Sequence, residues 1–318
     1  MPEHAKFRGF ALHTQTADFE QPVPPNPHSP HGYVIPRLDT DARLLDRAKE
    51  AGAVANGDTV RFEAPMVVVA DGSGGGVAGE RKAHQNAVAR RQYFGNVSGL
   101  ATDHLHIFAT RDMNERGAGY GWVFPLGDGR ANVGAGLSNR TLERTGRNLK
   151  DYFGRFLEEP RLAELLEGAE PEAPPKSWSL KMGMWGARRV GQGLMLVGDA
   201  GSMTHPISGE GVGYAIQGGR LAAAWAHEAR ARKDYSARLL AGYERAVRRE
   251  WTLEYLSEHV LVSALPNLGL LEPLFKASES NRRVRQTLIE SFTGDATVFR
   301  LFKHPRAVVK LFRASSGP

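Results

Sequence analysis

Apolar residues recur along the chain with two different periods, and the change of period separates predicted strands from predicted helices. Residues 7–20 alternate apolar and polar positions as a pair of strands does. A helix of about three turns is then expected to begin at Asp39 or Thr40 and to end at Gly52, a residue suited to a C-cap. Its apolar positions are Leu44, Leu45 and Ala48. Residues 66–70 (MVVVA) form a continuous apolar run, which predicts a strand buried on both faces of a parallel sheet.

The middle of the chain changes to short strand-like segments. From about residue 80 to 140 these segments are separated by Gly, Asp and Asn, so they predict an antiparallel sheet that forms a layer of its own. Residues 141–168 show helical spacing, and residues 193–197 (GLMLV) predict another buried strand. A long helix is expected from about Gly211 to His227. The tail beyond 235 is predicted to be mostly helical, with breaks around Pro266 and Pro273.

These elements predict an α/β fold in which two domains interlock. Residues 1–79 and 188–235 are expected to form one domain around the parallel strands. Residues 80–187 are expected to form an antiparallel-sheet domain with a two-layer α+β arrangement. Residues 236–318 complete the chain as a helical C-terminal region.

The composition is that of a soluble globular protein and excludes several classes of chemistry. Of the 318 residues, 41% are hydrophobic and 24% charged, and no apolar run approaches the ~20 residues of a membrane-spanning helix. The first residues lack a signal-peptide pattern, so a cytoplasmic location is expected. The absence of cysteine excludes disulfides, thiolate metal ligands and a cysteine nucleophile.

The net charge of +6 reflects a basic excess that lies late in the chain. The arginines of this region are Arg245, Arg248, Arg249, Arg282, Arg283 and Arg285. Two interpretations remain open, a solvated helical surface or attraction to anionic lipid headgroups or a diphosphate substrate, and the second includes peripheral contact with the inner face of a membrane. No nucleic-acid-binding module accompanies the charge, so no nucleic-acid partner is expected. The pattern does not predict an oligomeric state.

Residues 193–226 (GLMLVGDAGSMTHPISGEGVGYAIQGGRLAAAWA) carry the most specific chemistry. A predicted strand ends at Gly198 and Asp199, a glycine-rich turn follows, and a helix of small residues comes next. An aspartate at the end of a strand can accept hydrogen bonds from a polyol, and a glycine-rich turn lets backbone amides approach a planar ring. The amino terminus of the helix would face partial negative charge. The alternative is a generic strand-turn-helix whose small residues serve close packing.

This run resembles the second FAD motif of the group 2 FAD-dependent oxidoreductases, which share the fold of para-hydroxybenzoate hydroxylase, in the form typical of geranylgeranyl reductases, G-D-A-x-x-x-x-x-P-x-x-G-E-G. The resemblance implies that residues 1–79 and 188–235 are an incomplete FAD/NAD(P)-binding, Rossmann-like domain. It implies that Gly198 and Asp199 lie at the ribityl chain. The residues implied to border the isoalloxazine are Pro206, Gly209, Glu210, Gly211 and Val212. The helix that begins at Gly211 would direct its dipole at the N1–C2=O edge.

Two further segments match the same family. VVVADGSGG (67–75) implies that Asp71 and Gly72 end a strand near the cofactor. The family more often continues with a polar residue and an arginine where Gly74 to Val77 stand here, which weakens a pyridine-nucleotide role for this loop. YVIPRLDTDARLL (33–45) matches an arginine-then-aspartate helix opening, which implies that Arg37 lies near the flavin domain. A surface ion pair of Arg37 with Asp41 across one helical turn is the alternative.

The segment GYGWVFPLGDGRANVGAGL (119–137) distinguishes members of this group. In a strand Tyr120, Trp122 and Phe124 share one face, as they also would in an ordinary sandwich core. The match to Y-x-W-x-F-P-x-G implies that these aromatic residues and Pro125 line a cavity for an isoprenoid chain, a substrate for which apolar burial contributes ~0.8 kcal/mol per CH₂. Flavin halogenases carry a related W-x-W-x-I-P motif, and the residues at 120 and 124 favour the reductase.

Three histidines are candidates for proton transfer or metal binding. His205 lies inside the flavin motif, either as a proton donor to the substrate carbon or, as we favour, as polar lining. His104 and His106 share one face of a predicted strand, but neither nearby carboxylates nor cysteines are evident, so no metal site is expected.

The amino-terminal unit of the family has no counterpart in this sequence. FAD enzymes of the group begin with a βαβ unit that opens with G-x-G-x-x-G, whereas the glycine-rich stretch here, Gly72 to Gly79, follows the strand at 66–70. A second shortening leaves Val54 and Met66 only a dozen positions apart. Without the amide cradle for the pyrophosphate, we expect this chain alone to bind FAD weakly or not at all.

The resemblance implies an FAD-dependent oxidoreductase that reduces carbon–carbon double bonds of an isoprenoid or lipid-like substrate. The flavin would deliver hydride to one alkene carbon, and NADPH or another donor would reduce the flavin again. An FAD-dependent monooxygenase or halogenase on the same fold is one alternative. A truncated, non-catalytic remnant is another.

Overall fold

The computed structural model describes most of the chain, namely residues 4–14, 18–23, 31–57, 63–74, 86–98, 100, 103–109, 119–184, 187–264, 278 and 281–293. The glycines from Gly75 to Gly79, the predicted helix breaks at Pro266 and Pro273, and the tail from 294 lie outside the described residues.

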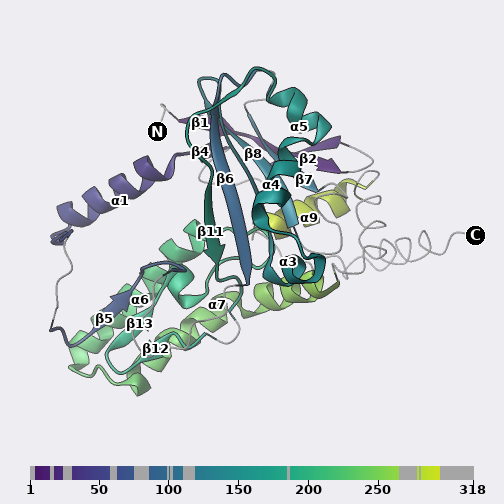
Figure 1. Cartoon of the computed structure of the whole chain (residues 1–318). Helices are drawn as coiled ribbons and strands as arrows, with labels where there is room; N and C mark the ends of the chain where they lie inside the picture. Colours follow the sequence, from purple (N-terminus) through teal and green to yellow (C-terminus); the bar gives the residue numbers. More distant parts are fainter. Residues whose placement is uncertain are drawn as a thin grey trace, which may run out of the picture.

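An eight-stranded sheet dominates the structure (Figure 1). Its strands run in the order β10-β6-β9-β8-β7-β2-β3, and β11 also pairs with β6. The bounds are Gly9–Thr14 (β2), Asp18–Pro22 (β3), Ala87–Gly95 (β6), His104–Ala109 (β7), Gly119–Gly127 (β8), Arg130–Ser138 (β9), Glu170–Pro171 (β10) and Lys176–Leu180 (β11). The sheet predicted between 80 and 140 is therefore present.

The amino-terminal strands differ from the expected domain division. We grouped residues 1–79 with the parallel-strand domain, but β2 lies beside β7 in the large sheet and pairs with it in parallel, and β3 pairs antiparallel with β2. Apolar side chains of β2 explain this position, because Phe10 and Leu12 are buried in a cluster with Ile107 of β7. A separate two-stranded pair joins β1 (Ala5–Phe7) to β4 (Gly32–Val34).

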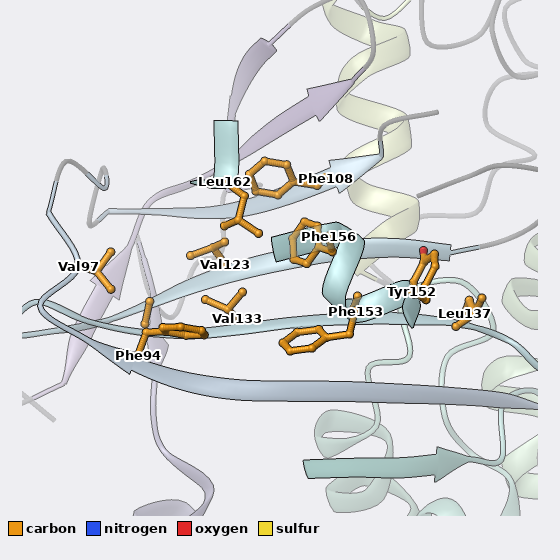
Figure 2. Packing of buried hydrophobic residues seen from close by; sticks show 12 residues of the cluster. Phe94, Val97, Phe108, Val123, Val133, Leu137, Tyr152, Phe153, Phe156 and Leu162 are labelled. Atoms are coloured by element: carbon orange, nitrogen blue, oxygen red, sulfur yellow. The ribbon is translucent and has the colours of Figure 1, made fainter. Parts of the chain in front are cut away.

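Three short helices cover one face of the large sheet (Figure 1). They are α3 (Asn139–Thr145), α4 (Leu149–Leu157) and α5 (Pro160–Leu165), within the segment predicted to be helical. Figure 2 shows Phe153 and Phe156 of α4 directed at Val123 and Val133 of the sheet. Phe156 is fully buried, and a Cβ at Gly121 would lie 2.3 Å from its ring, so the glycine makes room for the helix. On the opposite face, α9 (Arg282–Thr293) packs Ile289 against the cluster of β2 and β7.

A second, small sheet contains the two predicted parallel strands. Its order is β12 (Val190–Gly191), β13 (Leu194–Leu196) and β5 (Val67–Val69), with β13 and β5 parallel. Met195 is fully buried, as predicted. The prediction of burial on both faces is wrong for β5, because it is the edge strand of this sheet, and Val67 and Val68 are 46% and 41% exposed.

Two long helices lie below the large sheet and cover the small one (Figure 1). These are α6 (Val212–Arg232) and α7 (Ala237–Ala264), which agree with the predicted helical regions. They approach closely at Gly242, where a Cβ would lie 1.9 Å from the Trp225 ring. No helix in the described part of the chain is both long enough and apolar enough to cross a membrane.

Helix α1 (Arg37–Glu50) forms where it was predicted and extends away from the sheet (Figure 1). It begins after Pro36, without a side-chain cap from Asp39 or Thr40, and the left-handed Gly52 follows its end. None of its residues is buried, and Leu38 is 86% exposed. The apolar face that its sequence predicts therefore has no cover among the described residues.

Candidate functional site

The site is built around the loop that joins β13 to α6. The chain leaves β13, makes a short 3₁₀ turn (η1, Gly198–Gly201) and reaches α6 through Gly209 and Gly211. Gly198 and Gly209 have φ values of +58° and +67°, a backbone region that favours glycine. A Cβ at Gly198 would lie 3.1 Å from the Cβ of Ala215, so small residues bring the helix close to the loop. Close packing thus explains part of the glycine pattern without any ligand.

Asp199 lies half-buried at the carboxyl end of β13, where a polyol-binding carboxylate was predicted. Its Oδ1 accepts a hydrogen bond of 2.8 Å from the Thr204 hydroxyl. A Cβ at Gly211 would lie 3.2 Å from the same oxygen, so glycine keeps the space between the carboxylate and the start of α6 open. The remaining carboxylate oxygen can accept hydroxyl groups of a ligand.

Glu210 changes the expected role of the α6 amino terminus. Its Oε1 accepts a 2.7 Å hydrogen bond from the Gly213 amide, so the carboxylate already caps the helix. Burial raises the pKa of Glu210, an effect that the Gly213 and Val212 amides oppose and that the Asp199 charge reinforces. The helix dipole is therefore shared between Glu210 and any ring edge that approaches Gly211.

His205 is fully buried beneath this loop. Its Nδ1 accepts the Ser208 amide at 3.1 Å, which places the proton of the neutral ring on Nε2. Burial lowers the pKa of His205 to about 4, so the imidazole is neutral near pH 7. Nε2 lies 3.7 Å from Glu254 Oε1. These contacts hold the imidazole within the protein, and its role as polar lining stays a prediction.

A polar cluster from α6 and α7 supports His205 and was not predicted. The Tyr214 hydroxyl donates to Glu254, and the Tyr255 hydroxyl donates to the Met203 carbonyl. Burial, reinforced by Glu254, raises the pKa of both phenols, so both stay protonated. Thr204 lies inside the recognised motif and could have been found there. Glu254 lies forty residues beyond Tyr214 in the sequence, and no local pattern indicates this contact.

The aromatic residues of β8 lie where alternation predicts them. The rings of Tyr120 and Trp122 have centroids 5.7 Å apart, and those of Trp122 and Phe124 are 6.1 Å apart. All three are half-buried on the face opposite α4. The Tyr120 hydroxyl donates to the Ser208 carbonyl, so this aromatic row meets the glycine-rich loop. Pro125 differs from expectation, because the strand period turns it to the opposite, buried face with Val123.

Three other predicted residues lie outside this cluster. Arg37 forms a bidentate pair with Asp41 at 2.9 and 3.0 Å on exposed α1, the alternative stated for these residues. Asp71 is exposed after β5, and Gly72 has a φ of +78° with open space beside it. The loop then lines a pocket of about 250 Å³ with Ser73, Gly74 and Trp178.

The histidines of β7 have more carboxylate neighbours than the sequence suggested. His104 Nδ1 lies 2.8 Å from Asp103, and its Nε2 lies 3.8 Å from Glu20. His106 Nδ1 lies 3.0 Å from His13 Nε2. Within the described ranges, however, no group of three His, Cys, Asp or Glu side chains is arranged to hold a metal ion.

The described residues fit one part of a flavin. Asp199 offers an acceptor for ribityl hydroxyls, and the open space at Gly211 permits close approach of a flat ring to the start of α6. No described segment supplies a G-x-G-x-x-G loop between a strand and a helix, the usual cradle for a pyrophosphate.

Comparisons with known proteins agree with this description. The family model described as geranylgeranyl reductase catalytic domain matches residues 87–167. A digeranylgeranylglycerophospholipid reductase of Methanoculleus marisnigri is 32% identical over 67% of this chain and 58% of the relative. A menaquinone reductase of Mycobacterium tuberculosis is 29% identical over 70% of this chain and 61% of the relative. The chain thus spans less than two thirds of the length of these relatives.

Comparison with solved structures identifies the class of fold. A geranylgeranyl bacteriochlorophyll reductase-like protein of Thermoplasma acidophilum superposes with a TM-score of 0.69 at 26% identity, over 82% of this chain and 71% of that one. The flavin-dependent brominase Bmp2 gives a TM-score of 0.67 at 17% identity, over 98% and 83%, which indicates a shared fold. The fold is that of the FAD-dependent, Rossmann-like oxidoreductases and halogenases. Within that class, the chain is similar to the geranylgeranyl reductases, whose catalytic-domain model matches residues 87–167.

Proposed function

We propose that this protein is an FAD-dependent oxidoreductase that reduces carbon–carbon double bonds of an isoprenoid substrate. The observation that carries the proposal is the hydrogen bond from the Tyr120 hydroxyl to the Ser208 carbonyl. It joins the aromatic row of the reductase catalytic domain to the loop whose sequence resembles a flavin motif. A substrate alkene that lies on Trp122 would therefore be close to a ring held at Gly209–Val212.

The residues around this contact would bind and orient the two reactants. Asp199 would hold ribityl hydroxyls, and Gly209 to Val212 would border the ring. A bound, reduced flavin would supply a hydride for one alkene carbon, and a side chain or water would supply the proton for the other. Trp122 and Phe124 would hold the isoprenoid chain and exclude water, and burial contributes ~0.8 kcal/mol per CH₂. His205 would keep the loop in place through its acceptor nitrogen rather than donate the second hydrogen.

We also propose NADPH as the electron donor and the cytoplasm as the location. The apolar substrate would reach the protein from the inner face of a membrane, and the basic groups of α7 and α9 support transient contact with anionic lipid.

An anaerobic experiment tests the function. The protein is saturated with FAD, reduced with dithionite without excess, and mixed with geranylgeraniol in detergent under nitrogen. Return of the oxidised flavin absorbance, together with a saturated product, is expected. Flavin that is reoxidised only when oxygen is admitted would instead support the monooxygenase or halogenase reading. If the protein binds no flavin at saturating concentration, the result would support the alternative of a truncated, non-catalytic remnant.

A further inference from the structure

The face of the sheet that carries Trp122 extends beyond the aromatic row onto β9, β6 and β11. Residues directly opposite one another on neighbouring strands lie on the same face. The register aligns Tyr120 with Gly136, Gly136 with Ala89, and Ala89 with Trp178. The next line of residues, further from the loop, is Trp122, Gly134, Arg91 and Lys176.

Small residues in the middle of this face leave a shallow surface there, because no large side chain projects from it. A Cβ at Gly134 would lie 2.2 Å from the Trp122 ring, so the indole lies flat across β9. A Cβ at Gly136 would lie 3.5 Å from the Ala89 Cβ, which confirms that both belong to one face. Trp178 at the far side is 62% exposed. Apolar surface thus continues from the aromatic row to the outer strands.

Two basic residues stand where this apolar surface ends. Arg91 and Lys176 are direct cross-strand partners, with Cβ atoms roughly 5 Å apart in such a pair. The Arg91 guanidinium lies 4.5 Å over the Tyr93 ring. In the part of the chain that the structure describes, neither residue forms an ion pair with a carboxylate. The neighbouring carboxylate, Glu172, is bound by Arg130 at 2.5 and 2.7 Å.

This arrangement is electrostatically unfavourable without a ligand. Like charges directly opposite on neighbouring strands destabilise a sheet. An anion placed between Arg91 and Lys176 would remove that repulsion and gain charge-assisted hydrogen bonds from both.

The distance between the glycine-rich loop and the basic pair matches the length of one isoprenoid substrate, with its alkene at the loop and its headgroup at the pair. Leu180 lies on this face, two positions after Trp178 and four after Lys176, and a Cβ at Gly209 would lie 3.4 Å from the Leu180 Cδ1. Four strand residues at roughly 3.3 Å each put the basic pair about 13 Å from the loop. An isoprenoid chain of a few units covers that length.

We propose that Arg91 and Lys176 form the subsite for a phosphate headgroup attached to the isoprenoid. The inference rests on the proposed function, since it assigns the aromatic row to the hydrocarbon part. It selects an anionic, phosphate-bearing isoprenoid over one with a neutral headgroup, such as a quinone.

Binding of matched ligands tests the subsite without turnover. Geranylgeranyl monophosphate, geranylgeraniol and inorganic phosphate are titrated into the full chain, and tryptophan fluorescence is followed. The wild type is expected to bind the monophosphate roughly tenfold to a hundredfold more tightly than the alcohol. Arg91→Gln with Lys176→Gln should abolish this preference and leave alcohol binding unchanged. Arg90→Gln is the matched control, because Arg90 lies on the opposite face and donates to Ser177 Oγ at 2.8 Å.

Each other outcome has a definite meaning. A preference that survives in the double variant, or that Arg90→Gln removes equally, overturns the subsite. Inorganic phosphate that competes as well as the prenyl ester indicates a free-phosphate site and also overturns it. Equal wild-type affinity for ester and alcohol overturns the subsite while the proposed function stands. Failure of the wild type to bind either prenyl ligand overturns the proposed function itself.

Discussion

Replacement of the buried His205 should change how the stability of the protein depends on pH. Burial lowers its pKa to about 4, whereas an unfolded histidine titrates near 6.5. Between these values the unfolded chain binds a proton that the folded chain does not. Stability that is fully present above about pH 6.5 is therefore lost as the pH falls toward 4, at about 1.4 kcal/mol per unit.

The variant His205→Asn isolates this contribution. Asparagine keeps an acceptor for the Ser208 amide but does not titrate. Urea unfolding, followed by tryptophan fluorescence, gives the free energy of unfolding at about pH 7 and pH 5. Across that interval the wild type is expected to lose about 2 kcal/mol more than the variant. The exposed His227→Asn serves as control and should behave as the wild type. An equal loss in His205→Asn and the wild type would show that His205 does not cause the pH dependence of stability.

Three further predictions concern packing, charge and cofactor. Gly134→Ala should destabilise by ~1–3 kcal/mol, because its Cβ overlaps the Trp122 ring, whereas Gly136→Ala should be tolerated; equal effects in urea unfolding would contradict this. Glu244→Ala leaves the fully buried Arg189 without its carboxylate and should lower the free energy of unfolding by about 3 kcal/mol. Glu228→Ala, which breaks an exposed pair with Arg232, should lower it by less than ~0.5 kcal/mol, and thermal unfolding of both variants measures the difference. FAD, FMN and riboflavin should bind within about tenfold of one another by fluorescence titration, since the described residues offer partners only for a ribityl chain and a ring; a preference for FAD above about a hundredfold would contradict this.

Local periodicity predicted the elements that carry their own signal. The run at 193–197 forms β13, parallel to β5 as expected, and the small residues after Gly211 form α6. The two-residue period of β8 placed Tyr120, Trp122 and Phe124 on one face. The same period places Pro125 on the opposite face, so the prediction that Pro125 lines the substrate cavity with these three residues contradicts the alternation.

Contacts between distant segments could not be predicted. Nothing near β2 indicates that it would pair in parallel with β7 rather than join β5. Glu254 reaches Tyr214 only because α7 packs along α6. The exposure of Val67 and Val68 depends on which strands flank β5, and the apolar run at 66–70 does not indicate its neighbours. The pairing of Arg91 with Lys176 likewise becomes visible only through the register of β6 and β11.

We propose that an isoprenoid on the aromatic face of β8 is reduced beside the Gly198–Val212 loop. Mass analysis of geranylgeranyl monophosphate after anaerobic incubation with the FAD-saturated, dithionite-reduced protein tests it most directly. The lipid is expected to gain the mass of two hydrogen atoms for each double bond reduced, and Trp122→Ala should sharply lower the yield while flavin binding persists. Recovery of the unchanged lipid from fully reduced, flavin-loaded wild-type protein would contradict it.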